Sequence, residues 1–248
     1  MAGPMVPYSD QFICETSGRR ISFKNMRMYA VRLTGRATVL ASLLCSLLAA
    51  GVNGQADATA PHKRLYVLGD SLAGGSSQGG KGPHGWPSLV AEQLGMTLSL
   101  DAKGGTGYTT GGRQEGGRPY AQRIKRAIAA KPDVVVVEGS RNDTSPTKTR
   151  AAAADTLRRL RAGLPHARIL VIGPIYAFRR PISSHPIDEA VSTAAEKLSL
   201  PHLSAVHRGW FTGSAHQFIG SDGVHPTNAG HAYLAKRIRP ELTRLLHT

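Results

Sequence analysis

From residue 64 to the end of the chain, short apolar runs alternate with longer amphipathic stretches, and this alternation limits the folds that the chain can adopt. The apolar runs predict strands over 65–68, 97–101, 134–137, 168–172 and 202–206. The amphipathic stretches predict helices over 86–94, 119–130, 147–162, 187–198 and 227–246. Strands and helices in strict alternation indicate an α/β fold, with a mostly parallel sheet and helices on both of its faces.

Polar residues that could carry chemistry follow several of the predicted strands. An Asp-Ser pair at 70–71 follows the first strand, a glycine-rich loop at 103–113 the second, and an Asn-Asp pair at 142–143 the third. A further Asp and a His lie at the ends of 222–225, just before the last predicted helix. Parallel α/β sheets bind ligands beyond the carboxyl ends of their strands, so we expect these segments to meet there.

Three of these residues fit the roles of nucleophilic catalysis. A serine attacks an acyl carbon when a base takes its proton, and that histidine base needs a carboxylate to fix its tautomer. We interpret Ser71 as the nucleophile, His225 as the base and Asp222, three residues earlier, as its acid partner. Simpler alternatives stay open: Ser71 as a turn residue, Asp222 as a cap of the helix that begins near Pro226, and His225 as a structural histidine.

Four segments together resemble the motifs of the GDSL, or SGNH, hydrolase family. GDSL at 69–72 matches the nucleophile motif of that family, and the D-x-x-H pattern at 222–225 matches its last block. Between them, GGTG at 104–107 resembles the glycine block and GSRND at 139–143 resembles the Asn block. The blocks occur in the family's order over about 64–246, which is a much more specific signal than GDS alone.

The resemblance implies a three-layer α/β/α fold that is flavodoxin-like, with a parallel sheet of about five strands. It implies a triad of Ser71, His225 and Asp222. It also implies an oxyanion hole formed by the backbone N–H groups of Ser71 and Gly105 and by the side-chain amide of Asn142. The implied reaction is hydrolysis of carboxylic (acyl) esters through an acyl-enzyme, without a cofactor or a metal.

The chain departs from the family pattern in two places. Ser140 stands where the Asn block usually has a glycine, with Gly139 one place earlier, which leaves the loop around the Asn in question. The glycine block lacks its usual preceding Asn, so Gly104 and Gly107 are alternatives to Gly105 as the oxyanion donor.

A second serine formally fits another nucleophile motif. Ser77 lies in GSSQG at 75–79, which reads as G-x-S-x-G. That motif requires a strand before it and a helix after it, whereas glycine-rich loop is predicted on both sides here. We therefore interpret 75–79 as a flexible rim near the Ser71 pocket.

Several nearby residues are candidates for a lesser role. His84, Trp86 and Tyr108 are candidates for substrate binding, and packing in the core is an equal alternative for Trp86 and Tyr108. Asp70 and Asp143 are interpreted as braces of their own loops, because short acidic side chains hydrogen-bond nearby backbone.

The N-terminal part is predicted to lie outside the hydrolase domain, which we place at 62–248. Residues 1–25 are interpreted as an extension that is non-native or disordered, and 26–55 as a secretory signal peptide. The apolar run at 37–52 is shorter than the ~20 residues that a membrane span needs. Secretion, or export to the cell envelope, is favoured over a retained anchor.

Both cysteines, Cys14 and Cys45, lie in this removable part. A mature chain without them would have no disulfide, no thiolate metal site and no cysteine nucleophile. A lipid anchor on Cys45 is a weaker alternative, because Leu43 and Leu44 precede it where small residues would be expected.

The formal net charge of +15 favours attraction to anionic envelope surfaces. The basic residues are scattered along predicted helices without interleaved aromatics, so no nucleic-acid interface is predicted. We therefore expect a secreted serine hydrolase acting on small-molecule, glycan or lipid acyl esters. The alternatives are an envelope acyltransferase with the same triad, in which a sugar hydroxyl replaces water, and a non-catalytic basic envelope-binding module.

Overall fold

The computed structural model describes residues 14–16, 19–21, 62–113, 115–179, 182 and 185–247. The chain divides into two units, 1–58 and 59–248. In the first unit, β1 (Cys14–Thr16) and β2 (Arg19–Ile21) form an antiparallel pair. The predicted signal peptide at 26–55 lies outside the described residues.

The second unit contains a five-stranded sheet in the order β4-β3-β5-β6-β7, and every neighbouring pair of strands is parallel. Its strands are β3 (Arg64–Gly69), β4 (Thr97–Ala102), β5 (Val134–Glu138), β6 (Arg168–Ile172) and β7 (His202–Leu203). The predicted parallel α/β sheet is confirmed. The last strand was predicted to run on to residue 206, but it ends at Leu203, and Ser204 begins a turn by accepting the His207 N–H at 3.0 Å.

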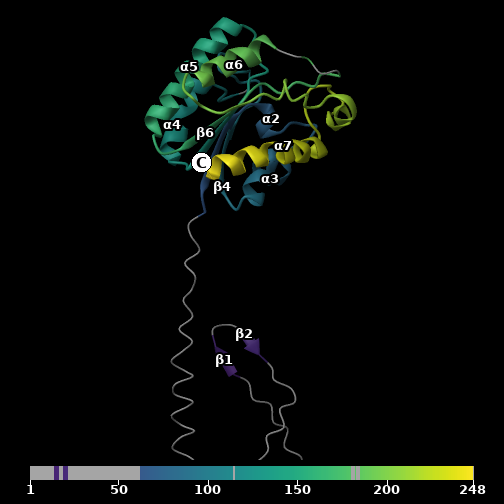
Figure 1. The fold of residues 1–248 in the computed structure, drawn as a ribbon. Coiled ribbons are helices and arrows are strands. Elements are labelled where there is room, and N and C mark those ends of the chain that lie inside the picture. The colour runs from purple at the N-terminus through teal and green to yellow at the C-terminus, as the bar shows by residue number, and fades with distance from the viewer. Residues whose placement is uncertain are drawn as a thin grey trace, which may run out of the picture. The chain divides into compact units, whose positions relative to one another are not determined.

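Helices cover both faces of this sheet, as Figure 1 shows. The longer ones are α3 (Trp86–Gln93), α4 (Tyr120–Ala130), α5 (Pro146–Gly163), α6 (Pro186–Glu196) and α7 (Asn228–His247). Each agrees with a predicted helix to within about two residues at either end. Three short elements had not been predicted: α2 (Ser71–Gly74) and the 3₁₀ helices η1 (Gly82–His84) and η2 (Gly213–Phe218).

The alternation of side chains along β3 divides the core into two halves. Leu65 and Val67 belong to the half that packs against α3 and α7. Tyr66 and Leu68 belong to the other half, which packs against α4, α5 and α6. Because successive strand residues point to opposite faces, one buried strand supports both layers, and the three-layer arrangement is confirmed.

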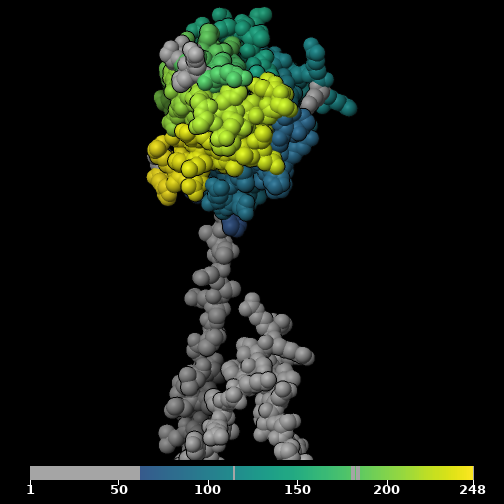
Figure 2. All heavy atoms as spheres, turned by 90° about the vertical axis from the view of Figure 1, so that its right-hand side faces the viewer, coloured from purple at the N-terminus to yellow at the C-terminus, as the bar shows by residue number. Residues whose placement is uncertain are grey.

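The start and the end of the domain pack together on one face of the sheet. Figures 1 and 2 show the C-terminal helix α7, in yellow, against the blue segment that contains α3. Trp86 on α3 and Leu234 on α7 are both fully buried in the same half of the core. Among the described residues, no helix combines the length and the apolar character needed to cross a bilayer.

Candidate active site

Ser71 lies at the carboxyl end of strand β3, as the first residue of helix α2. The preceding Asp70 is fully buried, and its Oδ1 accepts the Leu72 N–H at 2.7 Å, which caps the helix. Gly69 is required before it, because a Cβ there would lie 2.7 Å from the Cβ of Ala73. These local contacts fix the sharp turn that directs Ser71 into the pocket.

His225 and Asp222 lie together on the loop that precedes α7. Asp222 Oδ2 accepts a hydrogen bond from His225 Nδ1 at 2.6 Å, and its Oδ1 accepts the backbone N–H groups of Val224 and His225 at 2.8 and 2.9 Å. Burial alone would raise the pKa of Asp222, but these hydrogen bonds outweigh it and lower the pKa to about 2. Asp222 is therefore a carboxylate at any ordinary pH.

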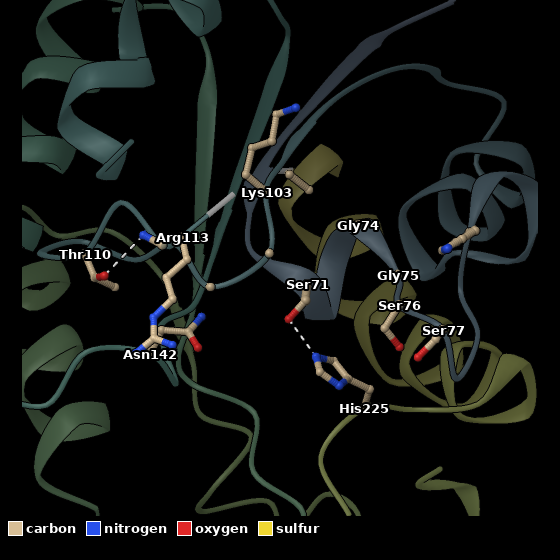
Figure 3. Close-up of a pocket in the computed structure, with 15 residues that line it drawn as sticks. Ser71, Gly74, Gly75, Ser76, Ser77, Lys103, Thr110, Arg113, Asn142 and His225 are labelled. Atoms are coloured by element: carbon tan, nitrogen blue, oxygen red, sulfur yellow. Dashed lines mark hydrogen bonds between the residues drawn. The ribbon is translucent and has the colours of Figure 1, made fainter. Parts of the chain in front are cut away.

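The tertiary structure brings this loop to Ser71. His225 Nε2 lies 2.9 Å from Ser71 Oγ, as Figure 3 shows. Since the Asp222 carboxylate can only accept, it holds the His225 proton on Nδ1 and leaves Nε2 to accept from the serine hydroxyl. The three predicted residues are thus joined in one hydrogen-bonded chain, in an arrangement that can deprotonate a serine.

Two residues that line the pocket, Ser71 and Gly105, have backbone N–H groups available as oxyanion donors. The N–H of Ser71 is the first of helix α2, and the first N–H groups of a helix have no partner within it. Gly105 lies in a turn closed by the Thr106 N–H to Lys103 O hydrogen bond, and its φ of +74° favours glycine. Among the described residues no acceptor takes the Gly105 N–H, whereas the Gly107 N–H donates to Thr110 O.

Asn142 lines the same pocket but already uses its side-chain amide within the protein. The Nδ2 group donates to Asp70 Oδ2 at 3.0 Å and to the Thr106 carbonyl at 2.9 Å. To donate to an oxyanion, Asn142 must exchange one of these two hydrogen bonds. Asn142 therefore lies in the pocket, as predicted, but both N–H donors of its side-chain amide already have partners within the protein.

Asp143 braces the glycine block rather than its own loop, which corrects the predicted contact. Its carboxylate accepts the backbone N–H groups of Tyr108 and Thr109, both at 2.9 Å, and the Thr109 hydroxyl at 2.5 Å. The side chain of Asp143 thereby ties the loop after β5 to the loop after β4.

The residues around Ser71 line an open pocket with a volume of about 860 Å³. Its lining residues are Ser71, Gly74, Gly75, Ser76, Ser77, Lys81, Ala102, Lys103, Gly104, Gly105, Thr110, Gly112, Arg113, Asn142 and His225. Ser77 is exposed on this rim, but it is the Ser71 hydroxyl that donates a hydrogen bond to His225 Nε2.

Sequence reasoning missed the contact that ties this rim to the histidine loop. Gln78 Oε1 accepts the backbone N–H of Ser221 at 3.0 Å and its hydroxyl at 3.1 Å. Gly80 N–H donates to Asn228 Oδ1 at 2.9 Å. The segment interpreted as a flexible rim is therefore fastened on both sides of His225.

The three residues proposed to bind substrate lie outside the lining of this pocket. Trp86 is fully buried, and its indole N–H donates to Leu72 O at 2.9 Å. Tyr108 is buried and packs edge-on against Tyr120, with ring centroids 5.0 Å apart. His84 is exposed on η1. For Trp86 and Tyr108, the structure matches the alternative of core packing.

Sequence reasoning also missed a buried carboxyl group beneath the nucleophile. Glu138 ends strand β5 and is 1% exposed. Burial and the nearby Asp70 carboxylate raise the pKa of Glu138 well above its ordinary value, although the Asp70 N–H partly offsets this. Burial also raises the pKa of Asp70, to about 6. No group of three or more His, Cys, Asp or Glu residues in the described part of the chain could hold a metal ion.

Comparison with known proteins connects this geometry to a family. The sequence pattern of the GDSL-like Lipase/Acylhydrolase family matches residues 67–233. The chain is 31% identical over 191 residues to the "GDSL lipase Rv0518" of Mycobacterium tuberculosis, covering 71% of this chain and 80% of that protein.

Solved structures show the same fold at lower identity. TesA matches with a TM-score of 0.57 and 22% identity, covering 74% of this chain and 99% of that one. A family two carbohydrate esterase from Clostridium thermocellum, in complex with cellohexaose, matches with a TM-score of 0.57 and 18% identity, covering 75% of this chain and 65% of that one. A two-domain esterase active on acetylated mannans matches with a TM-score of 0.59 and 18% identity, covering 75% of this chain and 50% of that one.

Proposed function

The chain belongs to the GDSL-like lipase/acylhydrolase family, and on that premise we propose that it is a serine esterase that removes short acyl groups from polar alcohols. The observation that carries the proposal is the hydrogen-bonded chain from Ser71 Oγ through His225 to Asp222, with distances of 2.9 and 2.6 Å. A serine held in this way can attack an ester carbonyl near neutral pH.

The proposed reaction has two halves that share one base. Ser71 Oγ attacks the ester carbon as His225 Nε2 takes its proton, and the oxyanion accepts hydrogen bonds from the Ser71 and Gly105 N–H groups. The intermediate collapses when His225 returns the proton to the leaving alcohol, which leaves an acyl group on Ser71. Water then attacks the acyl carbon with the help of His225, releasing the acid and restoring Ser71.

Asp222 acts through His225 in both halves. As a carboxylate it keeps the imidazole in the productive tautomer and stabilises the imidazolium that forms after each proton transfer. Asn142 would strengthen the oxyanion hole by exchanging its hydrogen bond to Asp70 or to Thr106 O for one to the developing charge.

The pocket lining supports a short acyl group. Apart from glycines, Ala102 is the one lining residue with an apolar side chain. Each buried methylene contributes about 0.8 kcal/mol only when it contacts apolar surface, which this pocket does not offer to a long chain. Lining hydroxyl groups suit a hydroxyl-rich alcohol, and two of the similar structures are carbohydrate-acting esterases. We propose an acylated sugar as the natural class of substrate.

Fluorophosphonate labelling combined with ester hydrolysis tests the nucleophile. We expect the unmodified chain to be labelled and to cleave 4-nitrophenyl acetate, and Ser71→Ala to lose both properties. Ser77→Ala is the matched control, since Ser77 lines the same pocket without a histidine contact. Labelling that survives Ser71→Ala, or that is lost in Ser77→Ala, would show that the proposed mechanism is wrong.

Chain-length dependence tests the acyl group. We expect kcat/KM for 4-nitrophenyl esters to fall from acetate to octanoate and laurate. A rate that rises with chain length, measured below the critical micelle concentration, would contradict a short-acyl substrate.

We also propose that the protein is exported, with 26–55 as its signal peptide. The order of basic, apolar and small polar residues in that segment supports this. Expression of the full chain followed by N-terminal sequencing tests it. A mature protein that begins between residues 50 and 62 is expected, whereas an uncleaved chain in the cytoplasmic fraction would contradict export.

A further inference from the structure

Positively charged side chains line the Ser71 pocket. Lys81, Lys103 and Arg113 contribute to its lining, and no Asp or Glu does among the described residues. The three residues come from different loops: Lys81 precedes η1, Lys103 follows β4, and Arg113 lies farther along the glycine-rich loop. The cations therefore converge on the pocket because the loops meet there.

None of these three side chains forms an ion pair with a carboxylate in the part of the chain that the structure describes. Elsewhere the domain pairs several of its arginines with carboxylates, as in the contact of Arg208 with Glu241 at 2.8 Å. Glu115 is near Arg113 in sequence, but it is exposed and does not line the pocket.

Of the two cations labelled in Figure 3, Arg113 is the one whose side chain extends toward another pocket-lining side chain. In Figure 3 its side chain extends from the glycine-rich loop toward Asn142, on the side of Ser71 opposite His225, whereas Lys103 extends away from Ser71. Gly112 makes this possible, since a Cβ there would lie 2.8 Å from the carbonyl oxygen of Gly104. The loop can thus fold back on itself and carry the arginine over the pocket.

Resting on the proposed function, we propose that the substrate is an acyl ester whose alcohol portion carries an anionic group, a carboxylate or a phosphate, and that Arg113 binds that group. A guanidinium presents paired N–H donors that match the oxygens of either anion. Lys81 and Lys103 add to the positive potential of the pocket, which raises the local concentration of an anionic substrate. Arg113 is then a specificity-determining residue that takes no part in bond breaking.

A matched pair of aryl esters tests this inference. 4-Acetoxybenzoate carries a carboxylate and 4-acetoxybenzamide is its neutral analogue, and each enzymatic rate is divided by the rate of hydrolysis in hydroxide. We expect the unmodified protein to prefer the anionic ester by about tenfold in kcat/KM at low salt. That preference should shrink when the ionic strength is raised to 0.5 M, because salt screens an open pocket.

The variant Arg113→Gln should lose most of this preference, because KM should rise much more for the anionic ester than for the neutral one. Arg150→Gln is the matched control, because Arg150 is exposed on α5 and does not line the pocket. Equal loss for both esters in Arg113→Gln, or no preference in the unmodified protein, would overturn the inference.

The outcome for Ser71→Ala separates this inference from the proposed function. Loss of both hydrolysis reactions in Ser71→Ala, together with a charge preference that Arg113→Gln leaves intact, refutes the role of Arg113 alone. Hydrolysis of either ester that survives Ser71→Ala refutes the proposed function, whatever the charge preference.

Discussion

The side-chain amide of Asn142 donates a hydrogen bond to Asp70 Oδ2 at 3.0 Å, and this contact joins the residue before the nucleophile to the loop after β5. Asp70 thus has two partners, since its other oxygen caps helix α2 through the Leu72 N–H. The same buried carboxylate sets the turn that presents Ser71 and the position of the amide beside it.

The variant Asp70→Asn is expected to lower kcat by about tenfold or more with little change in KM. Its oxygen can still accept the Leu72 N–H, but its NH₂ group would face the NH₂ group of Asn142. A double-mutant cycle with Asn142→Ala measures this coupling. Because both changes act on one positioned donor, the double variant should be hardly worse than Asn142→Ala, for which we expect a loss of about 10²-fold. Strictly additive losses would contradict the positioning role.

The variant Asp222→Asn is expected to lower kcat by about 10³- to 10⁴-fold while the protein stays folded. The asparagine amide can donate to Nδ1 and so favours the tautomer with the proton on Nε2, which cannot accept from Ser71. Steady-state kinetics with 4-nitrophenyl acetate and a thermal melt measure the two effects separately. A loss smaller than tenfold would assign Asp222 to loop capping alone.

Activity is expected to fall on acidification from pH 8 to pH 5, because an imidazolium cannot accept the serine proton. Asp222 contributes nothing to this decline, since its pKa of about 2 keeps it ionised. Asp70, with a pKa of about 6, titrates in the same range. The profile of Asp70→Asn therefore isolates the histidine, and a flat rate from pH 5 to pH 8 in that variant would contradict a histidine base.

The variant Glu138→Gln is expected to gain stability relative to the unmodified protein as the pH rises from 4 to 8. The pKa of Glu138 is raised in the folded state, so that state holds a proton which the unfolded state has lost, and stability falls with rising pH. Replacing this titratable group changes the slope of the unfolding free energy against pH by at most about 1.4 kcal/mol per pH unit. Urea unfolding across this pH range measures it, with the exposed Glu92→Gln as control. Parallel curves for Glu138→Gln and the unmodified protein would be inconsistent with a protonated Glu138.

The variant Gln78→Ala is expected to lower kcat by about tenfold, because it releases the loop next to Asp222 and a small misplacement of the base slows the reaction strongly. Gln78→Glu keeps an acceptor oxygen for Ser221 and should restore most of the rate. Gln122→Ala, on the exposed side of α4, is the matched control. Failure of Gln78→Glu to exceed Gln78→Ala would argue against positioning through Ser221.

Local patterns were enough to predict most of the sheet and helices. The run of valines in β5 is fully buried, and the alternation of Leu65 and Val67 with Tyr66 and Leu68 supports the two halves of the core. The short helix α2 was missed, although Asp70 before it is a typical N-cap residue that could have indicated it.

The pairing of Asp222 with His225 could be predicted from the sequence because the two residues lie three positions apart on one loop, so their contact depends on local geometry alone. Glycine and serine around 69–71 likewise indicated a sharp turn after a strand. Local sequence patterns were therefore sufficient to predict the fold class and the residue types that form the candidate site.

The way in which distant loops meet could not be predicted from local patterns and became visible in the packed domain. The contact of Ser71 with His225, that of Gln78 with Ser221, and the convergence of Arg113 with the other pocket cations all join segments with no local relation. The packing of the domain also buries Trp86 in the core and gives the side-chain amide of Asn142 a hydrogen-bond partner within the protein. Such contacts depend on the packing of whole loops and not on a periodic pattern, which is why the identity of the substrate is decided at this level.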